Sequence, residues 1–506
     1  MTASPEAPAQ EGGLDRVEVF CRGPWRQASS LRFILPVRYP EDTFSARAAA
    51  VGSATLPGRQ TPLWRPYALP ADDLMPHVRR YLNADGGDAS TGTLLTADIN
   101  ELTWLTGGDG AVWTLLLSRN RRRDFRVTGA HLMLFRLDIA FLVVDVEPVT
   151  SSAADWFDVL HFGRFVSGNR RRPVELACAD TAAGSAALRV LGPTAEAATA
   201  AAENGGRPRL RLRLPGISAL VDVLLARTLL GGESLATVQQ LNTPGQMLAY
   251  PVLFLAAAPQ AGPDLVARVV GSHHAERSLR TDSALALDQA VLAYGETSWL
   301  FTSTEGAGFL AVASEEVATQ FTQQVLPAHL RTEYFIAYLL AAFQRYALLT
   351  LSEQVAEGAL MAERRFAVTQ ARVLEFTGRA MFTQVTHSPH HQAWYRHVQT
   401  VHQVAQLHQE VRDEVQAFQD FERAHESERN ERRSRSAEVM VAVITGVIIP
   451  LQLVAALFAD QVHEWPLLRQ LSPAVQAYST LAVGVSLAAV IYLVLRVSGR
   501  KERQEN

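Results

Sequence analysis

Two long apolar runs near the end of the chain limit what it can fold into. Val439–Ala459 and Val475–Leu495 are each 21 residues long and contain no charged side chain. A helix needs roughly 20 apolar residues to cross about 30 Å of hydrocarbon, so both runs are long enough to span a bilayer. The sequence before Val439 has the composition of a water-soluble protein. We therefore expect a large soluble body on a two-helix membrane anchor.

Basic residues flank these two runs on one side of the predicted membrane. They are Arg432, Arg433 and Arg435 before the first run, and Arg496, Arg500, Lys501 and Arg503 after the second. The loop between the runs, residues 460–474, contains a single arginine, Arg469, and no lysine. Because basic flanks stay cytoplasmic, we expect a multi-pass protein of the cell (inner) membrane with both termini in the cytoplasm. The polar segment Met1–Gly13 lacks the features of a signal peptide, so none is expected.

The rest of the chain divides by composition into regions of different character. Short runs rich in Val, Ile, Leu and Phe predict strands at Val17–Cys21, Leu31–Arg38, Val112–Leu117, Phe125–Phe135, Ile139–Val146, Arg207–Leu214, Gln246–Ala256, Trp299–Thr302 and Gly308–Ala313. The predicted regions are a disordered tail (1–14), a cytoplasmic α/β domain (15–314) containing an Ala-rich linker or insertion (179–206), a helical region (315–438), two transmembrane helices (439–496) and a basic cytoplasmic tail (497–506).

The helical region contains a candidate stalk. Ser388 and Pro389 have the residue types of an N-cap and a first helical position, and no Pro or Gly follows before Gly446. Apolar residues recur at three- and four-residue steps from Trp394 to Phe421. We therefore predict one stalk helix from about Pro389 that runs unbroken into the first span, over roughly 105 Å. A helix of that length needs neighbours, which favours a coiled coil, a bundle or a homo-oligomer.

This layout resembles the CorA-type divalent-cation channels. Family members carry a proline in the first span, which ends with Tyr-Gly-Met-Asn. When this chain is aligned at Pro450, Phe458 takes the place of the tyrosine. The places of Gly, Met and Asn are then taken by Ala459, Asp460 and Gln461. The triplet itself is absent. The resemblance, specific over about 390–503, implies a pentamer, no covalently bound cofactor, and Mg²⁺ or another divalent cation as the transported or regulatory ion. It also implies an outer cation ring at Asp460 and Gln461.

The first span carries a candidate pore stripe. Glu438, Thr445, Gln452 and Ala459 are seven residues apart and so share one face of an α-helix, and Ile449 lies beside that face. Polar groups inside a membrane face a bundle interior or a water-filled path, so these five residues are the predicted pore lining. The alternative is that Thr445 and Gln452 hydrogen-bond across a helix pair in a passive anchor.

Two further charged clusters are candidate binding sites. The resemblance suggests regulatory cation binding by Asp413, Glu414 and Asp420 on the stalk; the alternative is a solvated helix face neutralised by nearby arginines. Two arginine-rich turns suit a phosphate-bearing ligand, or else are ordinary solvated loops. Their arginines are Arg121, Arg122 and Arg123 in one turn, and Arg170, Arg171 and Arg172 in the other.

The sequence favours two functions from different classes. No P-loop, GxGxxG, HExxH or GxSxG pattern occurs, so we expect no enzyme, and the net charge of −4 gives no case for nucleic acid. The first function is a CorA-like channel that passes divalent cations through a pore lined by the first span. The alternative is a membrane-anchored signalling or defence effector, whose cytoplasmic domain senses a phosphate-bearing ligand and gates or disrupts the membrane. The missing Gly-Met-Asn triplet favours the alternative.

Overall fold

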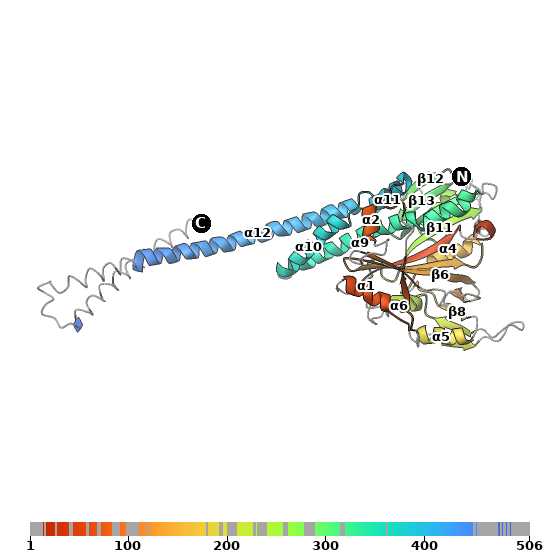
Figure 1. Ribbon diagram of the computed structural model, residues 1–506, viewed down its shortest axis with the longest axis horizontal. Helices are drawn as coiled ribbons and strands as arrows, with labels where there is room; N and C mark the ends of the chain where they lie inside the picture. The colour runs from red at the N-terminus through yellow and green to blue at the C-terminus, as the bar shows by residue number, and fades with distance from the viewer. Residues whose placement is uncertain are drawn as a thin grey trace, which may run out of the picture. The chain divides into compact units, whose positions relative to one another are not determined.

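The computed structural model contains a mixed α/β unit and long helices (Figure 1). The contacts within the chain divide it into two compact units, Met1–Asp413 and Glu414–Asn506. The structure describes residues 14, 17–25, 28–39, 44–56, 60–67, 72–82, 92–97, 111–118, 121–168, 170–178, 181–191, 196–199, 210–225, 229, 240–256, 262–277, 289–313, 319–360 and 363–448, with single positions at 452, 474, 475, 478, 482 and 486.

The strands join into one mixed sheet. They are β1 (Glu18–Val19), β2 (Ser30–Arg38), β3 (Trp64–Pro66), β4 (Gly92–Ala97), β5 (Val112–Ser118), β6 (Arg121–Phe135), β7 (Ile139–Pro148), β8 (Val174–Cys178), β9 (Glu196–Thr199), β10 (Leu210–Leu214), β11 (Leu248–Ala256), β12 (Val291–Gly295), β13 (Ser298–Ser303) and β14 (Gly306–Ala313). The main path is β12-β13-β14-β11-β2-β7-β6-β5-β8-β10-β9. Among the described strand pairs, β11 with β14 is parallel and the others are antiparallel.

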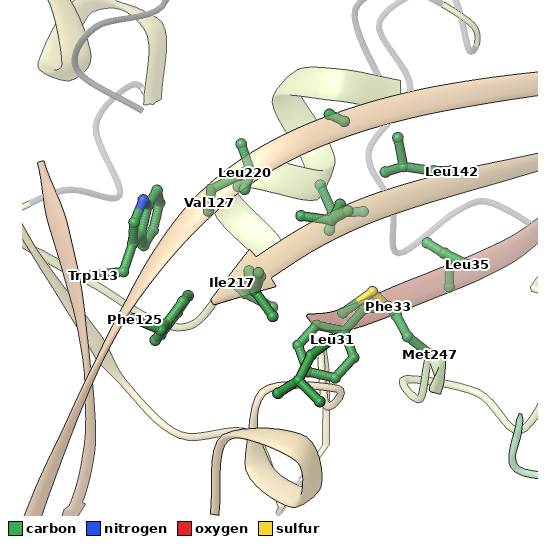
Figure 2. Packing of buried hydrophobic residues seen from close by; sticks show 14 of the residues in the cluster. Leu31, Phe33, Leu35, Trp113, Phe125, Val127, Leu142, Ile217, Leu220 and Met247 are labelled. Atoms are coloured by element: carbon green, nitrogen blue, oxygen red, sulfur yellow. The ribbon is translucent and has the colours of Figure 1, made fainter. Parts of the chain in front are cut away.

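The central strands β2 and β7 are buried on both faces, which explains their continuous apolar sequences. On one face, Leu31, Phe33 and Leu35 of β2 pack in the main core with Leu142 and Met247 (Figure 2). On the other face, the ring of Phe141 on β7 lies 6.1 Å from that of Tyr346 in the helical region. All the apolar residues of the predicted run Ile139–Val146 are buried.

Helices cover both faces of this sheet. In the first part of the chain they are η1 (Gly23–Trp25), α1 (Phe44–Ser53), α2 (Pro76–Tyr81), α4 (Ala153–Phe162), α5 (Thr181–Leu191), α6 (Ser218–Leu225) and α7 (Gly262–Val270). Helix α4 packs against β6, β7 and β11, whereas α5 packs against β8, β10 and α6. The Ala-rich segment 179–206, predicted as a linker or insertion, thus contains a packed helix and, in β9, an edge strand paired with β10. Small alanines gave little strand or helix signal, but they allow close packing at the sheet edge.

The later helices are η8 (Phe321–Val325, a π-helix), α8 (Leu326–Arg331), α9 (Glu333–Leu360), α10 (Glu363–Arg379), α11 (Pro389–Val401), α12 (Val404–Val443) and η9 (Ile444–Ile448, a second π-helix). Helix α9 packs against β7 and lies beside both α10 and α11. Buried contacts fix α11: the indole of Trp394 donates to the carbonyl of Tyr334 at 3.0 Å, and the Tyr395 hydroxyl donates to Gln344 Oε1 at 2.9 Å. Helix α11 therefore belongs to the core of the first unit.

The predicted stalk begins where expected but is not continuous. Ser388 occupies the N-cap position and Pro389 the first turn, although the Ser388 side chain makes no capping hydrogen bond. The helix then ends at Val401 and restarts at Val404. Gln403 between them has φ of 55°, a left-handed conformation, and Arg345 donates to the carbonyl of His402 at 3.1 Å. The unbroken helix of roughly 105 Å was thus a wrong prediction; α12 has 40 residues, or about 60 Å.

Candidate functional site

The C-terminal end of α12 presents an apolar surface. Among the described residues there, Val439, Met440 and Val441 are 64%, 68% and 60% exposed, and Ile444 and Ile448 of η9 are also exposed. A group of exposed large apolar side chains along one segment is unusual for a soluble protein, and such surfaces mark membrane or protein contacts. The preceding arginines Arg432, Arg433 and Arg435 are exposed as well, so a charged segment changes to an apolar one within about a turn.

The predicted pore residues lie partly in this segment. Glu438 is exposed on α12, Thr445 is exposed in η9, and Gln452 is an exposed helical position. Ile449, Ala459, Asp460 and Gln461 lie outside the described residues, as do most of the predicted spans 439–459 and 475–495.

The π-helix η9 changes the geometry of the predicted stripe. A π-turn takes more residues per turn than the 3.6 of an α-helix, because its hydrogen bonds run from i to i+5. Thr445 lies within η9, so the α-helical seven-residue spacing of the stripe does not hold through this turn. Such π-turns occur frequently at functional sites in helices. The apolar segment thus carries an irregularity at its first polar residue and at Gly446.

Among the described residues, one helical stretch is long and apolar enough to cross a membrane. It is Phe321–Glu357, and 83% of its most apolar window is buried inside the protein. Tyr338 and Phe343 of α9 are fully buried; the Tyr338 ring packs against Tyr250 of β11 and the Phe343 ring against Phe135 of β6. The apolar character of this stretch is therefore accounted for by its packing on the sheet.

The candidate regulatory acids lie along α12 without converging. Asp413 accepts a hydrogen bond from Gln409 Nε2 at 2.7 Å, and Asp420 forms an ion pair with Arg423 at 3.3 Å. Glu414 lies between them on the half-buried side of the same helix. Within the part of the chain that the structure describes, no group of three or more His, Cys, Asp or Glu side chains could hold a metal ion. Within one chain these acids thus interact with their own helix.

The first arginine-rich segment is a strand and not a turn. Arg121, Arg122 and Arg123 begin β6, and their side chains alternate between its faces. Arg121 Nη2 and Arg123 Nε donate to the fully buried carboxylate of Asp158 at 2.7 and 2.8 Å. Arg122, on the opposite face, is 3.5 Å from Glu175. The expectation of a loop was therefore wrong. A run of arginines suggests a solvated turn, but here Asp158, a residue distant in sequence, neutralises Arg121 and Arg123 within a strand.

The second arginine-rich segment stays outside regular structure and lies against aromatic rings. Arg170 lies 5.6 Å from the centre of the Phe165 ring, and Arg172 lies 5.4 Å from that of Phe162. Arg171 is exposed, and its side chain lies against Gly216. The two predicted arginine groups thus differ: carboxylates neutralise the first, whereas the second lies against the aromatic rings of Phe162 and Phe165.

Sequence reasoning missed the residues that surround this second group. They are Arg164 in the turn after α4, His161 on α4, and His273 and His274 after α7. The paired histidines within Gly271–Arg277 were the available signal, because the segment GSHHAER concentrates titratable side chains after a helix end. Burial is the main cause that lowers the pKa of His161 to about 4; the hydrogen bond to the Ser272 carbonyl opposes it, and nearby Arg164, His274 and Arg170 add to it, so this imidazole is neutral at pH 7.

Comparisons with known proteins do not assign a function to this geometry. No family model matches the sequence, and no curated protein matches it. Among solved structures, the CorA magnesium transporter from Methanocaldococcus jannaschii has 9% sequence identity with this chain and a TM-score of 0.25. The match covers 51% of this chain and 94% of that one. A likeness at this TM-score does not decide the fold.

Proposed function

We propose that this chain is a CorA-like membrane channel that passes divalent cations, with the segment after α12 lining the pore. The observation that carries the proposal is the exposed apolar end of α12, directly after Arg432, Arg433 and Arg435. Burying a large aliphatic side chain is worth roughly 1.5–3 kcal/mol, so a bilayer would stabilise five such residues substantially. The arginines favour the cytoplasmic side of the membrane for the α/β unit.

The channel role rests on the polar residues within that apolar segment. Thr445 and Gln452 are polar positions in a run that otherwise suits lipid, and polar groups at such depth face a bundle interior or a water-filled path. The π-helix η9 at Thr445 and Gly446 gives the segment a local widening that a passive anchor does not need. An outer ring of Asp460 and Gln461 would concentrate cations at the mouth.

The ion and the assembly follow from the sequence resemblance to the CorA-type channels. Mg²⁺ or a similar divalent cation is the proposed cargo, and a second such ion at Asp413, Glu414 and Asp420 would be regulatory if these acids meet those of a neighbouring copy. A ring of copies, proposed as a pentamer, is needed to enclose a pore, because one apolar helix cannot surround a water-filled path. No covalently bound cofactor and no catalytic step are proposed.

A second candidate function is a membrane-anchored effector that responds to a phosphate-bearing ligand. It is favoured by the absence of Gly-Met-Asn, which leaves Mg²⁺ selectivity without its family motif, and by the arginines gathered around Phe162 and Phe165. In this case the membrane segment would open or disrupt the bilayer only when the ligand is bound.

Cation flux in liposomes tests the channel proposal. Purified full-length protein is reconstituted with a Mg²⁺-sensitive dye inside the vesicles, and influx is compared for wild type, Gln452→Leu and Ser486→Ala. Gln452→Leu makes the path more apolar and should slow flux about tenfold, corresponding to roughly 1.4 kcal/mol. Ser486→Ala is the matched control, because that hydroxyl donates to Ala482 of its own helix at 2.7 Å.

The outcomes separate the two functions. Wild-type flux that Gln452→Leu slows and Ser486→Ala leaves unchanged supports the pore lining. Flux that is equal in all three proteins excludes Gln452 from the pore. Mg²⁺ influx into wild-type vesicles that is no faster than into protein-free vesicles contradicts a constitutive channel. Addition of phosphate compounds to the same vesicles then tests the effector function.

A further inference from the structure

An unbalanced group of arginines lies at the end of α4. Arg164 is 2% exposed, yet one carboxylate, Glu305, faces it, with Nη1 2.7 Å from Oε2. Its Nε is buried and has no hydrogen-bond partner among the described residues. A buried guanidinium with an unsatisfied N–H is costly, since such a donor has lost its water. This side chain therefore has a free donor in a site shielded from solvent.

A second arginine shares the same aromatic ring. Arg164 and Arg170 lie 5.2 and 5.6 Å from the centre of the Phe165 ring. Burial lowers the pKa of Arg164, and the like charge of Arg170 lowers it further, against the opposing effect of Glu305. Cation–π contact compensates part of this repulsion, but two guanidinium groups beside one ring remain a concentration of positive charge. An anion between them would remove the repulsion.

The neighbouring ring of Phe162 is flanked in the same way. Arg172 lies 5.4 Å from its centre, and the His274 ring stacks on it at 5.5 Å. Arg172 Nε, His273 Nδ1 and His274 Nδ1 are all buried and have no hydrogen-bond partner within the described part of the chain. With Arg164 Nε, four buried nitrogens of the 164–172 turn and of the His273–His274 pair thus lack a hydrogen-bond partner within the described residues.

A second nearby carboxylate, that of Asp158, is already engaged elsewhere. Asp158 accepts from Arg121, from Arg123 and from the backbone N–H of Ala275 at 3.2 Å, which anchors the loop that carries His273 and His274. Arg268 donates to carbonyls of that loop at 2.7 and 3.2 Å. Asp158 therefore holds the loop in place and does not neutralise the arginines of the 164–172 turn, which keep a net positive charge.

Burial also keeps the histidines of this group neutral. Together with the smaller effects of Arg277, Arg268 and Arg164, and against that of Glu305, burial lowers the pKa of His273 to about 4. Burial likewise lowers the pKa of His274. A neutral imidazole presents one N–H donor and adds no repulsion to the arginines. The group thus combines fixed cations with neutral donors, which is the chemistry of a phosphate site.

We propose that Arg164, Arg170 and Arg172, with His273 and His274, bind the phosphate group of a small phosphate-bearing ligand. The guanidinium forks match a tetrahedral oxyanion, and the buried nitrogens gain the acceptors that they lack. This site goes beyond ion conduction and does not rest on it, because it lies wholly within the first unit. Arg121 and Arg123 act as supports of the loop and do not contact the ligand.

Equilibrium dialysis of the full-length protein in mild detergent tests the site. Radiolabelled inorganic phosphate and ATP are the probes, in buffer without divalent cations. The double variant Arg170→Ala/Arg172→Ala removes two partly exposed cations and should weaken binding at least about tenfold. Arg122→Ala is the matched control, because Arg122 lies on the opposite face of β6 and pairs with Glu175.

The two probes distinguish the sources of the phosphate. Tighter binding of ATP than of phosphate, lost in the double variant and kept in Arg122→Ala, supports a phosphate ester as the ligand. Equal binding with the same dependence on the variants supports free phosphate. The site is overturned if neither probe binds saturably below about 10 mM, or if the double variant binds both as wild type does. Since flux is not measured, failure here leaves the channel proposal standing.

Discussion

Replacing Asp145 by asparagine should loosen the attachment of the helical region to the sheet. Asp145 of β7 lies 3.0 Å from Arg32 Nε on β2 and 3.4 Å from His131 Nε2 on β6. Arg32 also donates to the carbonyl of Arg331 at the end of α8 and lies 4.3 Å from the centre of the Phe335 ring on α9. The carboxylate therefore holds in place the arginine that joins three strands to two helices.

The magnitude follows from the acidity of this carboxyl group. Burial alone would raise its pKa, but Arg32 and His131 outweigh that effect and lower the pKa of Asp145 from 3.8 to about 2. A tenfold change in acidity corresponds to about 1.4 kcal/mol, so the ionised group stabilises the folded state by about 2 kcal/mol at neutral pH. Breaking a fully buried pair costs roughly 3–5 kcal/mol, but the side chains of Arg32 and Asp145 are 11% and 17% exposed, so we expect the smaller value.

The pH dependence has a definite sign. Because the folded pKa lies below the unfolded one, the stabilisation is complete above about pH 4 and is lost as the pH falls through about 2, with about half remaining at pH 3. Thermal unfolding of full-length Asp145→Asn, followed by tryptophan fluorescence, should therefore show a melting temperature about 4 °C below wild type at pH 7. At pH 3 the difference should be about half as large.

An exposed carboxylate on the neighbouring strand is the control. Asp124 of β6 accepts from the Thr114 hydroxyl at 2.7 Å in an exposed position, so Asp124→Asn should change stability by less than about 0.5 kcal/mol. A melting temperature of Asp145→Asn equal to wild type at pH 7 would refute the reasoning, as would a difference that stays the same at pH 3.

Two further substitutions test local features of the first unit by the same melting assay. Asp158→Ala leaves Arg121 and Arg123 without their buried acceptor and should cost roughly 3–5 kcal/mol; a change below about 0.5 kcal/mol would mean that these arginines are not held by Asp158. Gln403→Gly should stabilise by up to about 1 kcal/mol, because φ of 55° strains a residue with a Cβ and suits glycine. Gln403→Ala keeps the Cβ and should show no such gain; a gain equal to that of glycine would contradict the argument.

The sheet could be predicted where the sequence alone determines burial. Runs such as Leu31–Arg38 and Ile139–Val146 are rich in Val, Ile, Leu and Phe because both faces of β2 and β7 are covered. Helix α5 and strand β9 could not be predicted in this way, since their many alanines carry little hydrophobic signal. The order of the strands also depends on contacts between segments far apart in the chain, such as β11 with β2.

The candidate sites depended even more on long-range contacts. Three successive arginines were interpreted as a turn, but Arg121 and Arg123 are strand residues because Asp158 lies within reach from α4. The helix break at Gln403 has neither proline nor glycine to indicate it, and it depends on Arg345, which holds the preceding carbonyl from α9. Arg164 was not singled out, because burial beside Glu305 is a property of the fold.

A physical route connects the proposed phosphate site to the base of α12. Arg164 pairs with Glu305 in the turn between β13 and β14, and β13 packs against α11. His397 of α11 contacts the carbonyl of Ala290 beside this hairpin at 3.4 Å, and α11 leads through Gln403 into α12. If phosphate binding draws Arg164 toward the ligand, it weakens the hold on Glu305 and shifts the hairpin on which α11 rests. Coupling of this kind is reciprocal, so a change at α11 that favours one position of the hairpin must change phosphate affinity by the same factor.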